Sequence, residues 1–155
     1  MNIFILDEDP VIAARMLCDR HIPKMIVESA QMLSTAHRLL DGSPTKRRSR
    51  SGKTIQTYYE FKDARDELYY TAVHKHHPCT TWTMASIENY NWHYGHFAEM
   101  SKEFTFRRQK KHATWEKIGM ILAAPPINIP KIKRTEFAQA MSHYPECKVE
   151  GNAVQ

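Results

Sequence analysis

The chain has 155 residues, of which 42% are hydrophobic and 25% charged, so it is long enough to bury a core without metal or disulfide support. Its three cysteines form no C-x-x-C pair, no apolar run approaches the ~18 residues of a membrane span, and the first residues lack the basic region of a signal peptide. Five glycines are few for a sheet-rich fold. We therefore expect an all-α, single-domain, cytoplasmic protein with no membrane partner.

Two helices are predicted near the start of the chain. Asp9 followed by Pro10 is typical of a helix start and predicts a first helix from about residue 10 to 20. Pro23 either begins a second helix or kinks a continuous one, and Gly42 is typical of the end of that helix. On this second helix, polar side chains recur at spacings of three and four and therefore share one face. They are His21, Lys24, Glu28, Gln31, Thr35 and Arg38.

This polar face has two interpretations. Lys24 and Glu28, one turn apart, can form a solvated ion pair worth only ~0.3–0.5 kcal/mol, as on many charged helix faces. An imidazole, an amine, a carboxylate and a hydroxyl on one rigid face are also what acid–base or Schiff-base catalysis uses. The spacing alone does not decide between a solvated face and a site.

The net charge of +5 comes from one segment. Residues 43–53 form a predicted basic loop, and once its five cations are set aside, 17 of the 22 Lys and Arg residues remain and equal the 17 Asp and Glu residues. The five are Lys46, Arg47, Arg48, Arg50 and Lys53. Such a loop favours a polyanion, most commonly DNA, although a solvated loop without a specific partner fits equally well. The alternating residues that follow predict a short strand, which would give a β-hairpin near 46–61.

A long helix is predicted from about residue 81 to 112, because aromatic residues recur there at helical spacing. Its other face carries hydrogen-bonding side chains that could form the second wall of a pocket. These are Ser86, Asn89 and His93, together with His77 in the preceding segment. Trp82, Trp92 and Trp115 are candidate exposed platforms on which bases stack, although aromatic residues at this spacing lie more often in the core.

The end of this long helix is basic. Arg107, Arg108 and Lys111 either balance the helix dipole or contact phosphate. Nine histidines invite a metal site, but the spacing of His93 and His96 matches neither H-E-x-x-H nor a C-x-x-C pattern, so we expect no metal and no cofactor. The tail, residues 146–155, is expected to fray.

In the segments LDEDP, CDRHIPKMIVESAQMLSTAHR, HHPCTTWTMASIENYNW and EFTFRRQKKH, the chain resembles a family of small phage and bacterial proteins. This family is associated with the fold of the pyrimidine-dimer DNA glycosylases (endonuclease V-like). The resemblance to the phage relatives covers most of the chain. The resemblance to the glycosylase itself rests on Asp19, His21 and, seven residues further on, Glu28, with a similar helical layout and a late helix that ends in basic residues.

The resemblance implies a bundle of about four to five helices that binds DNA and acts on a pyrimidine base or its N-glycosidic bond. In the glycosylase, an N-terminal α-amine attacks the sugar, and the glutamate that matches Glu28 assists. Methionine before a residue as large as Asn2 is usually retained, so the small N-terminal nucleophile is absent here and Lys24 becomes the candidate amine. We expect Glu28, Lys24 and His21 to be catalytic. The expected pocket comprises Asp19, Gln31, Thr35, His77, Ser86, Asn89 and His93.

Other functions stay open, because likeness of fold does not determine the reaction. A phage transferase that modifies hydroxymethyl-pyrimidine bases in DNA would need the same side chains. A DNA-binding or host-interaction protein without enzymatic activity would use the two helix faces as an interface. A metal-dependent hydrolase would draw on the histidines. Phage origin would place the protein in the host cytoplasm, and the sequence leaves the oligomeric state open.

Overall fold

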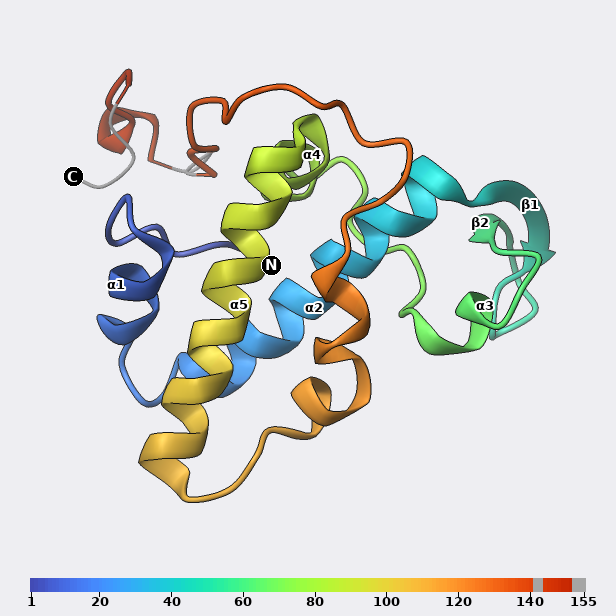
Figure 1. The fold of residues 1–155 in the computed structure, drawn as a ribbon. Coiled ribbons are helices and arrows are strands. Elements are labelled where there is room, and N and C mark those ends of the chain that lie inside the picture. Colours follow the sequence, from blue (N-terminus) through green and yellow to red (C-terminus); the bar gives the residue numbers. More distant parts are fainter. Residues whose placement is uncertain (141–143, 152–155) are drawn as a thin grey trace.

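The computed structural model describes residues 1–140 and 144–151, and two long helices cross at its centre (Figure 1). The helices are α1 (Pro10–Arg15), α2 (Ile22–Asp41), α3 (Arg65–Leu68), α4 (Pro78–Ala85) and α5 (Ile87–Arg108). α1 packs on α5, and α4 packs on both α2 and α5. Large apolar side chains of α2 and α5 fill the space between them. Within the described residues, no helix combines the length and the apolar character needed to cross a bilayer.

α1 begins where its capping residue predicts, and α2 begins where its proline predicts. The Asp9 carboxylate accepts hydrogen bonds from the backbone N–H groups of Val11 and Ile12 and so caps α1, but α1 ends at Arg15 rather than near residue 20. α2 keeps its predicted bounds, with a proline in the first turn and Gly42 after its last residue. Because α2 is long and one of its faces is buried, it positions most of the candidate site.

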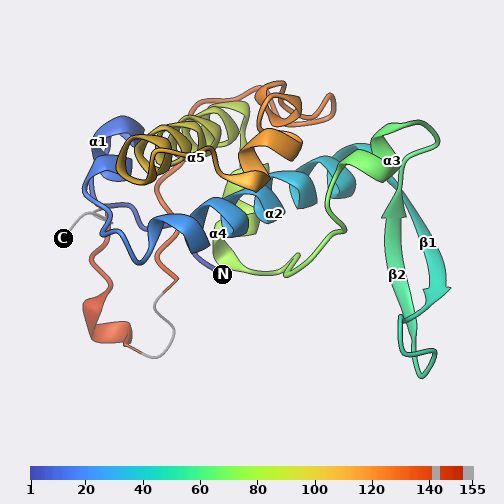
Figure 2. The ribbon, with the colours of Figure 1, turned by 90° about the horizontal axis from the view of Figure 1, so that it is seen from below.

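A two-stranded antiparallel hairpin follows α2, so the fold is helix-rich with a small sheet rather than all-α. β1 (Ser43–Arg48) pairs with β2 (Ile55–Glu60), from Ser43 opposite Glu60 to Arg48 opposite Ile55. The hairpin predicted near 46–61 is confirmed, and its first strand extends into the segment 43–53 that was expected to be a loop. Figure 2 shows the hairpin projecting from the helices, with most of its residues exposed.

The helix predicted from 81 to 112 is divided in two at Ser86. The backbone of Ser86 is extended (φ −154°, ψ 157°), and its hydroxyl accepts a hydrogen bond of 3.0 Å from the N–H of Asn89, which caps α5. The N–H of Ile87 donates to the carbonyl of Pro130, so a distant segment also satisfies this helix start. Serine is a strong N-cap residue, and the cap replaces the intrahelical bonds that a continuous helix would make.

Short irregular turns complete the chain after Gln109 ends α5 in a left-handed conformation (φ 54°). They are the π-helical turn η1 (Trp115–Gly119) and the 3-10 turns η2 (Ile121–Ala123) and η3 (Pro145–Cys147). Beyond η3, the backbone N–H of Val149 donates to the side-chain carbonyl of Gln139 at 2.9 Å. Of the tail that was expected to fray, residues 152–155 lie outside the described residues.

Trp82 and Trp92 are core residues rather than exposed stacking platforms. They are 5% and 7% exposed and contact each other edge-to-face, with 5.8 Å between their ring centroids. Trp115 is partly buried and packs against Phe97. The prediction that bases stack on the first two tryptophans is therefore wrong, because burial of large aromatic area against the helices dominates at this spacing.

Candidate functional site

The polar face of α2 changes from exposed to buried along its length. From its start to its end, His21 and Lys24 are exposed, Glu28 and Gln31 are partly buried, and Thr35 and Arg38 are buried. The exposed His21 ring lies against Phe4, with 5.2 Å between ring centroids. The six side chains predicted to act together thus occupy three environments, and Glu28 lies at the boundary between solvent and core.

Glu28 lies where two primary amines meet. Its Oε1 is 3.5 Å from the Nζ of Lys24, and its Oε2 is 3.6 Å from the α-ammonium group of Met1. Oε2 also accepts a hydrogen bond of 2.9 Å from the backbone N–H of Asn2. The side chain of Lys24 is 75% exposed, whereas those of Glu28 and Met1 are 12% and 4% exposed. One amine therefore faces solvent, and the other is held against the protein.

Packing of the first residues brings the Met1 amine to Glu28. Ile3 and Ile5 are buried in an apolar cluster that includes Cys79. Burial raises the pKa of the Cys79 thiol, and this thiol donates a hydrogen bond to the side-chain carbonyl of Asn2 at 3.1 Å. Met1 and Asn2 are therefore site residues that the sequence prediction did not include. The alternation of apolar residues in the first segment was the available signal.

His77 is a predicted pocket residue that lies near this amine–carboxylate group. It precedes α4, and its Nδ1 accepts a hydrogen bond of 3.2 Å from the backbone N–H of Cys79. Burial lowers the pKa of His77, the positive N-terminus and His74 lower it further, and Glu28 opposes the shift. A neutral ring whose Nδ1 accepts must carry its hydrogen on Nε2. His77 is thus prepared to donate a hydrogen bond rather than to act as a base.

The other predicted wall of the pocket is part of the core. His93 is fully buried between the hydroxyl groups of Thr83 and Ser29, and burial lowers its pKa to about 3. Asn89 donates to the carbonyl of Trp82 and to the hydroxyl of Thr135. Ser86 caps α5, as described above. These three residues stabilise the packing of α4 and α5, and the structure does not bring them to the Glu28 carboxylate.

Thr35 and Arg38 connect α2 to the segment after the hairpin. The Thr35 hydroxyl exchanges hydrogen bonds with the backbone of Val73. Arg38, which is 4% exposed, donates to the Asp66 carboxylate at 2.7 Å and to four backbone carbonyl groups. The carbonyl groups belong to Tyr59, Asp66, Tyr69 and Tyr70. A buried guanidinium with this many partners fixes the hairpin and α3 to α2.

Asp19 and Arg107 pair with each other. The Arg107 guanidinium donates at 2.9 Å to the carboxylates of Asp19 and Glu103 and also bonds to the backbone carbonyls of Arg15 and Leu17. These contacts join the end of α5 to the segment between α1 and α2. Arg108 and Lys111, the other cations predicted there, are exposed.

The cations predicted in segment 43–53 lie on the hairpin. Arg47 forms an ion pair with Glu60, and its guanidinium lies over the ring of Tyr58, 5.8 Å from the centroid. The remaining four are exposed: Lys46, Arg48, Arg50 and Lys53. The predicted basic surface is therefore present, with one of its five charges compensated by a carboxylate.

Glu28 does not line either of two clefts in the described part of the chain. One, of about 370 Å³, lies between the hairpin and residues 71–73, and the other, of about 330 Å³, lies beside Phe106 and Trp115. The exposed partner of Glu28 is Lys24, whose side chain is 75% exposed.

Over residues 1–140 and 144–151, no three His, Cys, Asp or Glu side chains are grouped closely enough to hold a metal ion. Comparison of the chain with protein-family models, with curated proteins and with solved structures finds no match.

Proposed function

We propose that this protein is a DNA-processing enzyme of the glycosylase/lyase type, which acts on a pyrimidine base or its N-glycosidic bond with Glu28 as the acid/base. The observation that carries this proposal is the position of the Glu28 carboxylate between two primary amines, 3.5 Å from Lys24 and 3.6 Å from Met1. A carboxylate beside an amine is the arrangement that Schiff-base chemistry on a sugar requires.

In such a reaction the unprotonated amine forms a bond to the sugar C1′ while the bond from C1′ to the base breaks, and the base leaves with a proton. The resulting adduct opens to a Schiff base. Once the amine nitrogen has bonded to C1′ it carries a positive charge, and Glu28 would take the proton that this nitrogen then loses, while the departing base takes a proton from water. His77, with its hydrogen on Nε2, would donate a hydrogen bond near the same group.

Retention of the first methionine does not remove the amine from the site, because the α-amine of Met1 itself lies at Glu28. Burial of Ile3 and Ile5 also holds the Met1 α-amine beside Glu28, whereas the side chain of Lys24 is 75% exposed. Met1 is therefore our first choice of nucleophile, with Lys24 as the second.

Exposed cations on the hairpin support DNA as the substrate. Arg48, Arg50 and Lys53 are exposed. Their positive charges lie on the surface, where the side chains do not stabilise a hydrophobic core. Lysine and arginine side chains of this kind neutralise phosphates in protein–DNA complexes and make binding dependent on salt.

Mass spectrometry of nucleosides tests the function directly. DNA that contains ultraviolet photoproducts, and separately hydroxymethyl-pyrimidines, is incubated with the protein and digested. Release of a base with strand cleavage would support the proposal. A changed nucleoside mass without cleavage would instead support a transferase, and chemically unchanged DNA would indicate a binding protein.

The same assay tests the role of Glu28. Replacing the carboxylate by an amide in Glu28→Gln removes the proton acceptor, so we expect turnover to fall by about 10²–10⁴-fold with DNA affinity retained. Glu116→Gln, at an exposed position on η1, is the matched control and should keep normal turnover. Normal turnover by Glu28→Gln would contradict the assignment.

A further inference from the structure

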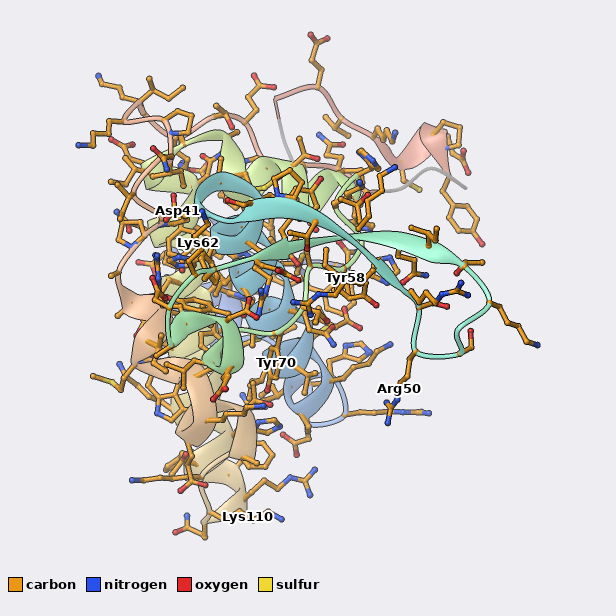
Figure 3. The ribbon with its side chains drawn as sticks, turned by 90° about the vertical axis from the view of Figure 1, so that its right-hand side faces the viewer. Asp41, Arg50, Tyr58, Lys62, Tyr70 and Lys110 are labelled. Atoms are coloured by element: carbon orange, nitrogen blue, oxygen red, sulfur yellow. The ribbon has the colours of Figure 1, made fainter. Side chains whose placement is uncertain are left out.

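The two basic clusters of the chain lie at opposite ends of the molecule. The hairpin cations are Lys46, Arg48, Arg50 and Lys53, and the α5-end cations are Arg108, Lys110 and Lys111. Figures 1 and 2 both place the last turn of α5 far from the hairpin. Figure 3 shows Arg50 at the tip of the hairpin, extending away from the strands, and Lys110 beyond the end of α5.

The hairpin shares one side of α2 with the N-terminus. In Figure 2 the N-terminus and the hairpin tip lie on the same side of α2, whereas α5 lies on the other side. The N-terminus shows where the Glu28 carboxylate lies, because the Met1 amine and the Asn2 N–H both contact this carboxylate. The hairpin cations therefore lie on the same side of α2 as Met1, whose amine contacts Glu28.

The positive charges of the hairpin are largely uncompensated. Within residues 1–140 and 144–151, no carboxylate lies within 4.0 Å of Lys46, Arg48, Arg50 or Lys53, although Arg48 donates to the carbonyl of Gly52. Arg47 is the member of this segment that forms an ion pair, with Glu60. Four exposed cations on a projecting ribbon produce a positive field that an anionic partner would neutralise.

The hairpin is fixed to the same helix that carries Glu28. Arg38 of α2 binds the carbonyl of Tyr59 in β2 and the segment around Asp66 and Tyr69. Glu28 and Arg38 are ten residues apart on α2, which corresponds to about 15 Å along the helix axis. The distance from the site to the root of the hairpin is thus set by a rigid element.

The dimensions of the hairpin match a groove of duplex DNA. Its strands have six residues each, or about 20 Å of length. The major groove is about 12 Å wide and admits a two-stranded ribbon.

We propose that the β1–β2 hairpin is a duplex-binding arm that enters a DNA groove and contacts phosphates outside the nucleotide at Glu28. The position of that nucleotide rests on the proposed function, whereas duplex binding by the arm does not. The α5-end cations take no part in this contact.

Two triple variants that remove the same charge test the arm. Arg48, Arg50 and Lys53 are replaced by Gln in one, and Arg108, Lys110 and Lys111 in the other. Binding of each to a duplex of about 25 base pairs is measured over a range of salt concentrations. Log K falls as log salt rises, and each phosphate contact makes this slope steeper by about 0.9. The slope should therefore be less steep by about 2–3 for the hairpin variant, and by less than about one for the α5-end variant. Equal losses in both variants, or no loss in the hairpin variant, would overturn the proposal.

Ethylation interference on a duplex with one modified pyrimidine tests which phosphates the arm contacts. We expect a group of interfering phosphates outside the modified nucleotide, and loss of this group in the hairpin variant. Interference confined to the modified nucleotide, or unchanged in the hairpin variant, would contradict the arm. The two proposals can be separated. If the hairpin variant has a less steep salt slope but the wild-type protein leaves every DNA substrate unchanged, duplex binding by the arm is supported and the reaction at Glu28 is contradicted. If base release depends on Glu28 but the hairpin variant keeps the normal slope, the reaction is supported and the arm is contradicted.

Discussion

Glu28 and Arg38 project from the same face of α2, but their partners come from different parts of the chain. Glu28 meets a backbone N–H 26 residues earlier, and Arg38 meets a carbonyl 32 residues later. The helical period places both side chains on one face, and the sequence predicts this much. Which of them becomes a candidate catalytic group depends on the distant segments that pack there, and a local period does not encode those segments.

Replacement of Arg38 tests its structural role. Arg38→Met leaves four buried or partly buried carbonyl groups and the Asp66 carboxylate without their donor, so we expect a loss of about 3 kcal/mol or more in the free energy of unfolding. Urea denaturation measures this loss. Arg65→Gln is the control, because its partner Asp63 is 51% exposed, and it should cost less than about 1 kcal/mol. A loss below about 1 kcal/mol for Arg38→Met would show that the hydrogen bonds of Arg38 contribute little to the free energy of unfolding.

At the scale of elements, capping residues predict α1 and α2 well, and the long helix poorly. Asp9 and Gly42 mark real helix ends. Ser86, by contrast, is compatible with a helix interior as well as with a cap. The break there is supported by the bond from Ile87 to the carbonyl of Pro130, more than 40 residues later. Tertiary contacts therefore decide a boundary that the aromatic spacing in 81–112 does not reveal.

Replacement by alanine should have opposite effects on stability at two glycines, Gly42 and Gly95. At Gly42, between α2 and β1, an added Cβ would lie 2.5 Å from the carbonyl oxygen of Arg38, so Gly42→Ala should destabilise the protein by about 1–3 kcal/mol. Gly95 is inside α5, where an added Cβ would meet Pro10 at 3.6 Å, an ordinary contact. Gly95→Ala should therefore stabilise by about 0.5–1 kcal/mol through helix propensity. Thermal unfolding of both variants checks the contrast, and shifts of the same sign would contradict it.

For the whole molecule, buried histidines predict acid sensitivity. Burial lowers the pKa of His37 and His96 to about 4 and that of His93 to about 3, so protonation favours the unfolded state. The stability that each neutral ring contributes is fully present above its unfolded pKa near 6.5 and is lost as pH falls towards the folded value. Protonation of each of these histidines should therefore lower the free energy of unfolding by up to ~2 kcal/mol between pH 7 and pH 5.

His96→Phe provides the matched test of this acid sensitivity. Within the described residues, neither ring nitrogen of His96 has a hydrogen-bond partner, and the ring stacks on Trp92. Phenylalanine keeps the stacking and removes the titration, so urea midpoints should fall less between pH 7 and pH 5 than in the wild type. His74→Asn, at an exposed position with positive φ that asparagine tolerates, should keep the wild-type dependence. An unchanged dependence in His96→Phe would contradict this origin of the acid sensitivity.

The position of the site relative to the basic clusters is also a property of the whole molecule. Composition identifies the cations of segment 43–53 and of the α5 end as equivalent candidates for phosphate contacts. The fold distinguishes them, because the hairpin lies on the same side of α2 as the N-terminus (Figure 2) and Arg107 is used within the protein. Likewise, the amine of Met1 reaches Glu28 because Ile3 and Ile5 are buried, and no spacing on α2 predicts that contact.

The central claim is that an amine beside Glu28 reacts with a DNA sugar, and borohydride trapping tests it most directly. Borohydride reduces a Schiff base between protein and a damaged or abasic duplex to a stable amine, and peptide mass mapping then locates the attached sugar. We expect the adduct on the α-amine of Met1 or, as the second choice, on Lys24. The adduct should be lost in Glu28→Gln. Absence of any adduct, or an adduct on a lysine distant from Glu28, would contradict the claim.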